Sequence, residues 1–177
     1  MKQSQLINQF LDQSKDLVWI VNLDFQLIYA NQTYFNFMEE VTGAEKKLNE
    51  SAFIDCFGKD DIKTWTTYYK RAFSDEYFEV EEHFYNEKSG EIQYNQVTFE
   101  PLRGNDQKIF AVACQSRDIT RIAKLRSEAS QLIDASLDVF CTFNEQGEFI
   151  YVSAAAKRQW GYSPEELIGT PYRSLVI

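Results

Sequence analysis

Apolar positions change their spacing several times along the chain, and each change marks the border of a predicted element. Between residues 6 and 11 they recur at helical spacing, which predicts an N-terminal amphipathic helix. The next segments, "LVWIV" and "FQLIYA", are short and apolar, and the turn signal Asn22-Leu23-Asp24 lies between them. This pattern predicts a β-hairpin. Residues 33–41 then fit a short helix that ends at Thr42-Gly43, where glycine suits a helix C-terminus.

The middle of the chain predicts a longer helix followed by three strands. Asp60 or Asp61 is expected to cap the helix, whose apolar residues form one stripe. Residues 76–85 alternate in part, residues 91–102 change their alternation phase near Asn95-Gln96, and "KIFAVACQS" is a nearly continuous apolar run. We interpret the phase change as a β-bulge. Strands on both sides of a helical block predict an antiparallel α+β domain rather than a doubly wound one.

Another helical pattern begins where the last predicted strand meets "RDIT". The side-chain oxygens of Asp118 and Thr120 suit the start of a helix, because they can accept hydrogen bonds from unpaired backbone N–H groups. Apolar residues then follow at steps of three, four and three, which is the spacing of a helix-pairing seam: Ile122, Leu125, Ala129 and Leu132. The same spacing also fits a single amphipathic helix that lies on its own domain.

The sequence after this helical pattern repeats an earlier segment of the chain. Shifted by 122 residues, the segment 12–29 aligns without gaps on 134–151, with six identities in eighteen positions. Self-similarity at a fixed distance indicates repeated structural units. The second unit continues into Ser163-Pro164-Glu165-Glu166, which predicts a helix start with a capping residue, a proline and early acids. Only about forty residues of this unit are present, fewer than an independent domain usually needs.

Composition narrows the functional classes. The chain has 177 residues, of which 44% are hydrophobic and 15% aromatic, as is typical of a globular protein with a packed core. Its net charge of -9, without a cluster of basic residues, argues against nucleic acid as a partner. No apolar stretch approaches the ~20 residues that cross a bilayer, and the start does not resemble a signal peptide. Cys56, Cys114 and Cys141 are widely separated and fit reduced thiols, so we expect a soluble cytoplasmic protein.

Three motifs carry a resemblance to the PAS domain family, which occurs in tandem in bacterial sensor histidine kinases and cyclic-dinucleotide enzymes. They are the "DLVWIVNLDFQLIYAN" hairpin, the "RDIT" after the last strand, and "GYSPEELIG" in the second copy. In the first copy, "FMEEVTGAEKKL" stands in place of the family's usual helical motif. With this resemblance the chain divides into an N-terminal helix (1–14), a first PAS domain (15–120), a linker helix (121–136) and the incomplete start of a second PAS domain (137–177).

The resemblance implies a five-stranded antiparallel sheet with helices packed on one face. It also implies that Asp118, Ile119 and Thr120 join the last strand to an outgoing signalling helix. Such a module binds a small ligand or a partner and relays its state to a downstream signalling domain, as in the input region of a two-component sensor histidine kinase. We expect a homodimer, held together by the seam named above or by the first helix, through Leu6, Ile7, Phe10 and Leu11.

The residues do not match the cofactor sites of other PAS proteins. Blue-light members carry a reactive cysteine in an Asn-Cys-Arg-Phe-type segment, whereas Cys56 lies in "FIDCFGKD". Haem-binding members typically place a histidine on the long helix, and residues 60–73 contain none. The single histidine, His83, lies on a predicted strand and fits no common metal site. We therefore predict no flavin adduct, no haem, no metal and no catalytic residue.

A non-covalent ligand is still compatible with the sequence. Its cavity would be lined by large side chains from the predicted strands and helices: Trp19, Phe35, Trp65, Tyr69, Phe78 and Val97. Aromatic residues at such spacing are more often core than pocket. Three functions therefore stay open: a sensory input module, a dimerising spacer without a ligand, and a small α+β enzyme with an aromatic-lined cavity.

Overall fold

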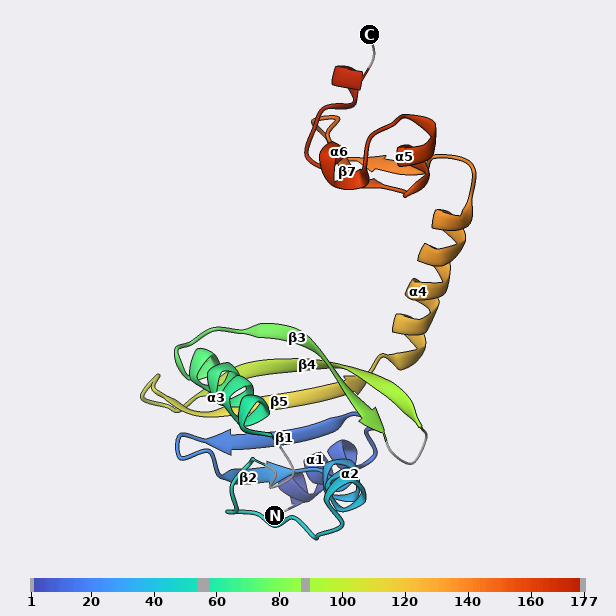
Figure 1. The fold of residues 1–177 in the computed structure, drawn as a ribbon. Coiled ribbons are helices and arrows are strands. Elements are labelled where there is room, and N and C mark those ends of the chain that lie inside the picture. Colours follow the sequence, from blue (N-terminus) through green and yellow to red (C-terminus); the bar gives the residue numbers. More distant parts are fainter. Residues whose placement is uncertain (1, 54–57, 87–89, 176–177) are drawn as a thin grey trace. The chain divides into compact units, whose positions relative to one another are not determined.

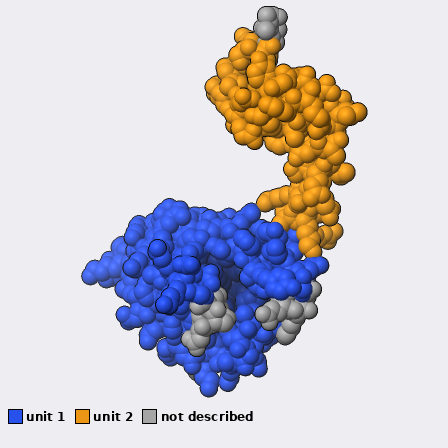
Figure 2. Space-filling model, viewed as in Figure 1, with its two compact units in different colours: residues 1–120 blue, residues 121–177 orange. Residues whose placement is uncertain are grey.

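The computed structural model describes residues 2–53, 58–86 and 90–175 and is shown in Figure 1. The chain divides into two compact units, residues 1–120 and 121–177, which are coloured separately in Figure 2. Unit 1 contains α1 (Lys2–Asp12), β1 (Leu17–Asn22), β2 (Leu27–Ala30), α2 (Gln32–Thr42), α3 (Lys59–Phe73), β3 (Phe78–Asn86), β4 (Glu91–Arg103) and β5 (Ile109–Asp118). Unit 2 comprises α4 (Thr120–Ala135) from its second residue on, β6 (Cys141–Phe143), β7 (Phe149–Val152), α5 (Ala155–Gln159), α6 (Pro164–Leu167) and the 3-10 helix η1 (Tyr172–Leu175).

Unit 1 is built on a five-stranded antiparallel sheet in the order β2-β1-β5-β4-β3. Helix α3 packs on β4 and β5, and α2 packs on β1 (Figure 1). This arrangement confirms the predicted α+β fold. Chain order and spatial order differ because the last strand, β5, lies in the middle of the sheet between β1 and β4. Ala111 and Val112 of β5 face opposite sides of the sheet and are both buried, which agrees with the nearly continuous apolar run of this strand.

The first hairpin follows the turn signal in the sequence. The side-chain oxygen of Asn22 accepts hydrogen bonds from the backbone N–H groups of Asp24 (3.0 Å) and Gln26 (2.8 Å), as asparagine commonly does in turns. Helix α2 begins one residue earlier than predicted. It ends at Gly43, whose φ of 70° lies in the left-handed region that glycine adopts without a steric cost. The predicted positions of this hairpin and of the end of this helix are confirmed.

Asn31 connects three elements at the end of this hairpin. Its buried side-chain oxygen accepts from the backbone N–H groups of Val18 (3.1 Å) and Tyr34 (3.0 Å). Its amide nitrogen donates to the carbonyl oxygens of Leu11 (3.0 Å) and Asp16 (2.9 Å). One side chain therefore joins the end of α1, the start of β1 and the first turn of α2.

The start of α3 differs from the prediction. Gly58 is the N-cap residue, and Asp61 accepts a hydrogen bond from the Gly58 N–H at 3.0 Å. Neither Asp60 nor Asp61 is the cap itself, so that expectation was wrong. Asp61 instead takes the third helical position, where a carboxylate satisfies an unpaired N–H and also favours the positive end of the helix dipole.

The bulge predicted near Asn95-Gln96 was also wrong. Strands β3 and β4 pair in continuous register from Phe78↔Phe99 to Asn86↔Glu91, and the register of β4 with β5 shifts only between Leu102 and Arg103. The alternation phase of the sequence changes for a different reason. The core-facing positions of β4 continue regularly from Phe99 through Val97 to Asn95, but the last of them is polar. A buried polar residue, and not an extra residue, produced the signal.

The first hairpin of unit 2 repeats side-chain to backbone hydrogen bonds of the first hairpin of unit 1. The Asn144 side-chain oxygen accepts from Gln146 N (3.0 Å) and Glu148 N (2.8 Å), as Asn22 does in the first hairpin. Ser153 takes the place of Asn31, and its hydroxyl accepts from Phe140 N at 3.0 Å. These pairs keep the shift of 122 residues seen in the sequence. The repeated bonds show that the two segments fold in the same way locally.

The rest of unit 2 is small. Ser163 is the N-cap of α6 with Pro164 in the first turn, and the Ser163 N–H donates to the Glu166 carboxylate at 2.7 Å, which lowers the pKa of that carboxyl. The predicted helix start is therefore confirmed. A compact core of Phe149, Val152, Ala156 and Leu167 lies beneath the two-stranded sheet of β6 and β7. Within residues 2–53, 58–86 and 90–175, no helix is both long and apolar enough to cross a membrane.

Candidate functional site

The six side chains predicted to line a cavity all lie in the core of unit 1. Trp19, Tyr69, Phe78 and Val97 are buried, and Phe35 and Trp65 are partly buried against them. The indole N–H of Trp19 on β1 donates to the hydroxyl of Tyr69 on α3 at 3.0 Å. The ring of Trp65 contacts both, with centroid distances of 6.2 Å to Trp19 and 6.1 Å to Tyr69. These residues form an aromatic cluster between the sheet and α3.

Two central members of this cluster were missed by the sequence analysis. Phe99 on β4 is fully buried and stacks on Phe78 with a centroid distance of 4.9 Å. It also contacts Trp65 and Tyr69, each at 5.8 Å. Tyr34 on α2 lies 5.4 Å from Trp19. The alternation of Val97 and Phe99 could have identified Phe99, since both face the same side of a strand.

Burial keeps the polar groups of the aromatic cluster uncharged. It raises the pKa of the Tyr69 phenol well above its usual value, and it does the same to the thiol of Cys114 on β5. A thiol that stays protonated is a poor nucleophile, so Cys114 behaves as a small apolar residue. Cys141 is half-buried in unit 2, and Cys56 lies outside the described residues.

The core face of the sheet changes from apolar to polar along its strands. Residues paired across neighbouring strands form an apolar row of Trp19, Cys114, Phe99 and Phe78. Four residues further along, the paired residues on the same face are Glu82, Asn95 and Asp118, from β3, β4 and β5. We refer to these three residues as the polar row.

One helix residue reaches the polar row. The hydroxyl of Tyr68 on α3 donates to the Glu82 carboxylate at 2.6 Å. Burial and this hydrogen bond together raise the pKa of Tyr68 to about 12. The phenol therefore remains a hydrogen-bond donor throughout the physiological pH range, and Glu82 is held toward the helix-covered side of the sheet.

The junction between β5 and α4 is attached to β4. The Ile119 N–H donates to the Tyr94 carbonyl at 2.9 Å, and the Thr120 hydroxyl accepts from the Tyr94 N–H at 3.0 Å. Asp118 accepts from the Thr120 N–H at 2.8 Å, and the Ile119 side chain is buried. Asp118 thus acts at the helix start as predicted. The Thr120 hydroxyl does not cap the helix, because it binds the backbone of the neighbouring strand.

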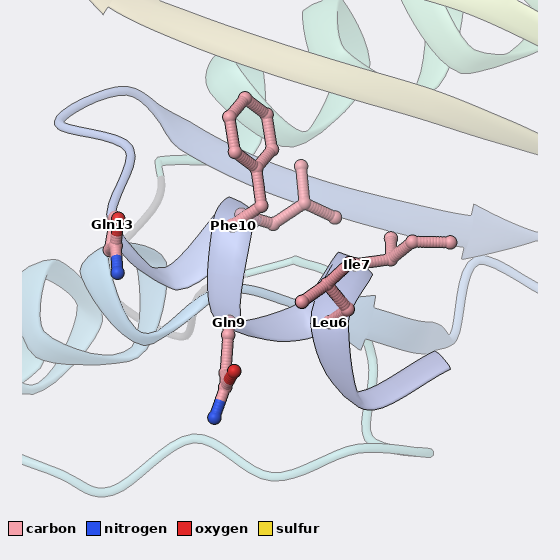
Figure 3. A pocket seen from close by; sticks show the side chains of 6 residues that line it. Leu6, Ile7, Gln9, Phe10 and Gln13 are labelled. Atoms are coloured by element: carbon pink, nitrogen blue, oxygen red, sulfur yellow. The ribbon is translucent and has the colours of Figure 1, made fainter. Parts of the chain in front are cut away.

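The predicted pairing surfaces are exposed. In α4 no residue is buried, and the seam residues Ile122, Leu125, Ala129 and Leu132 are all exposed. In α1, Leu6, Ile7 and Phe10 are exposed, Leu11 is partly buried, and all four line a surface groove with Gln9 and Gln13. Figure 3 shows Phe10 and Gln9 pointing to opposite sides of α1, with Gln13 just beyond the end of the helix.

The single histidine lies on the surface. His83 on β3 is exposed, and its ring lies 5.8 Å from that of its cross-strand partner Tyr94. Among the described residues, no group of three or more His, Cys, Asp or Glu side chains is arranged to hold a metal ion.

Comparison with known proteins identifies a family over most of the chain. A family model described as the PAS fold matches residues 11–123, and a second one with the same description matches residues 127–177. No curated protein matches the chain.

Several solved structures share the fold. The phage VqmA–DPO complex is 16% identical with a TM-score of 0.54, over 77% of this chain and 62% of that one. An RNA-binding light-oxygen-voltage receptor is 12% identical with a TM-score of 0.53, over 73% of this chain and 36% of that one. The LOV protein of Rhodobacter sphaeroides is 16% identical with a TM-score of 0.49, over 76% of this chain and 78% of that one. At these identities the likeness concerns the fold alone.

Proposed function

The chain belongs to the PAS family as a tandem of two domains, the second of them short, and from this we propose that it is a sensory input module of a signalling protein. Unit 1 binds a small ligand or a partner and relays its state through α4 to a downstream domain, such as that of a sensor histidine kinase. Membership in the PAS family supports the sensory role. The expected domain borders, the cytoplasmic location and the lack of a flavin, haem or metal stay predictions.

One observation carries the proposed relay. The backbone of Tyr94 on β4 forms hydrogen bonds with both Ile119 and Thr120, so the first residue of α4 is attached to the sheet by more than the chain itself. Interiors are closely packed and shift between discrete arrangements rather than deform continuously. A ligand that favours one packing of β4 therefore also favours one position of the helix start.

Removing the Asp118 carboxylate tests this relay. In a signalling protein that contains this chain, Asp118→Ala is expected to reduce stimulus-dependent output by about tenfold, since coupling energies are typically 1–3 kcal/mol. The measurement is output with and without stimulus, together with a thermal melt of the isolated chain. Asp106→Ala serves as the control, because Asp106 accepts a similar local hydrogen bond from Lys108 N in the β4–β5 turn. Normal stimulus-dependent output from a folded Asp118→Ala protein contradicts the relay.

Two other functions are less well supported. A dimerising spacer would bind no ligand. Native mass spectrometry of the gently purified chain tests this function, because a co-purifying small molecule would contradict it. An enzyme requires a reactive pair of side chains. The buried Tyr69 and Cys114 are held in their neutral forms, and they offer no such pair.

We also propose that the module is a homodimer that forms through α1 and α4. Phe10 and Leu132 are 76% and 75% exposed, far more than large apolar side chains usually are in a folded domain. Burying a charge at a contact of this kind costs enough to weaken association by more than tenfold. Phe10→Glu and Leu132→Glu are expected to shift the chain toward monomer in light scattering. Gln9→Glu, on the other side of α1, is expected to leave the dimer intact, and an unchanged mass in both apolar variants contradicts the proposal.

A further inference from the structure

We propose that Arg158 on α5 receives the relay at the C-terminal end of α4, so that unit 2 is the first target of the state of unit 1. Arg158 is a positioning residue, because it acts through the backbone of α4 and contacts no ligand. This inference rests on the proposed relay and deepens it. It assigns the element that responds when the start of α4 changes.

Two side chains of α5 bind the end of α4 and the residues that follow it. The Arg158 guanidinium donates to the carbonyl oxygens of Ser136 at 2.8 Å and Asp134 at 3.3 Å. The neighbouring Gln159 amide donates to the Leu137 carbonyl at 3.2 Å. Carbonyl groups at a helix C-terminus have no partner within the helix and carry a partial negative charge, so a cation is favourable there. The charged Arg158 therefore makes the stronger of the two attachments.

Unit 1 uses the same arrangement for its own first helix. The carboxylate of Asp12 at the end of α1 accepts from the Gln32 N–H at 2.9 Å. The carboxylate of Asp134, 122 residues later in α4, accepts from the Ala154 N–H at 3.1 Å. With this shift, α1 corresponds to the later part of α4. Helix α4 is therefore both the outgoing helix of unit 1 and the incoming helix of unit 2.

The carbonyl that Arg158 binds also has a counterpart in unit 1. Ser14 corresponds to Ser136 in the repeat, and its carbonyl accepts from the Thr33 hydroxyl at 2.7 Å. The residue that corresponds to Thr33 is Ala155, whose side chain has no donor. In unit 2 the bond comes instead from Arg158, which is exposed. Its contribution can therefore be removed without a change to the core of unit 2.

Helix α5 connects this attachment to the core of unit 2. Its residue Ala156 is fully buried in that core, and the Ala156 carbonyl accepts from the Trp160 N–H at 2.8 Å. The ring centroids of Trp160 and Phe149, another core residue, lie 6.4 Å apart. Helix α4 is unbroken between Tyr94, which binds its first residue, and Arg158, which binds its end (Figure 1). A shift of the helix start is therefore passed to α5.

Hydrogen exchange of the full chain tests this path without a stimulus. Thr120→Val keeps the shape of the side chain but removes the hydroxyl that binds Tyr94, so it loosens the start of α4. We expect this variant to raise amide exchange in residues 154–161 by about fivefold, the lower end of typical coupling between sites. In the Arg158→Ala background, Thr120→Val is expected to add no further increase. The four proteins form a double-mutant cycle that measures the coupling directly.

A purely structural Arg158 gives a different result. Arg158→Ala would then raise exchange in α5, but the effect of Thr120→Val would persist in full, and this outcome would overturn the proposal. Arg158→Lys keeps the charge and a donor, and we expect it to restore most of the coupling. Lys157→Ala is the control, because it removes the neighbouring exposed cation of the same helix, and it is expected to leave the coupling unchanged.

Unaltered exchange in α5 of the Thr120→Val protein would also overturn the proposal, since nothing would then arrive at Arg158. The relay out of unit 1 is judged separately by the output of Asp118→Ala. Reduced output from that variant together with an unaltered α5 refutes the role of Arg158 alone. The two proposals can therefore fail independently.

Discussion

Replacing Phe99 with alanine is expected to destabilise unit 1 by about 3–5 kcal/mol, the range measured for large-to-small changes of buried aromatic residues. Phe99 is fully buried at the centre of the aromatic cluster, where it contacts Trp65, Tyr69 and Phe78. Its neighbours come from α3 and β3, so they cannot all move into the space that the ring leaves. The loss therefore includes both the transfer of the ring to water and the cavity that remains.

Urea unfolding followed by tryptophan fluorescence measures this loss, since Trp19 and Trp65 lie in the same cluster. Phe110→Ala is the matched control. Phe110 belongs to β5 but is 49% exposed, so its removal is expected to cost less than about 1 kcal/mol. Similar midpoints for the two variants would show that Phe99 is not central to the core.

The second large effect is expected from a polar residue. Asn31→Ala should lower the stability of unit 1 by about 3 kcal/mol, more than a typical surface change. The substitution leaves the N–H groups of Val18 and Tyr34 and the carbonyls of Leu11 and Asp16 without their side-chain partner. Each buried group that stays unpaired costs about 1–3 kcal/mol, although water can reach some of them.

A comparison of two asparagines checks this prediction. Asn36 on α2 is exposed and accepts one hydrogen bond, from the Gln32 side chain at 2.8 Å. Asn36→Ala is therefore expected to change the free energy of unfolding by less than about 0.5 kcal/mol. If Asn31→Ala costs no more than Asn36→Ala, water replaces the lost bonds and the connection between α1, β1 and α2 does not depend on Asn31.

Local signals in the sequence were reliable where one short segment contains all the interacting groups. Asn22 predicted the first turn because its side chain bonds the backbone two and four residues later. Ser163 and Glu166 predicted the start of α6 because a capping box closes within three residues. The repeat was equally visible, since the same local bonds return 122 residues later.

Signals that depend on other strands were misread. The phase change at Asn95 suggested a bulge, because a polar residue on a core face looks like an extra residue when only one strand is visible. Asn95 pairs with Glu82 on β3 and with Asp118 on β5, so its polar side chain belongs to the regular register of the sheet. Both partners are distant in the sequence, and this pairing could not be read from one strand. Thr120 was likewise expected to cap its own helix, whereas its hydroxyl bonds Tyr94 on another strand.

The order of the elements, the first turn, the end of α2, the start of α6, the repeat and the PAS resemblance could all be predicted from the amino-acid sequence alone. Each of these depends on side chains and backbone groups only a few residues apart, or on a direct match of motifs. Which faces meet became visible only in the folded chain: the aromatic cluster around Phe99, the attachment of the first residue of α4 to β4, and the polar row. Register across a sheet joins residues that are distant in the chain, and the hydrogen bonds and packing that set this register form only when the strands come together.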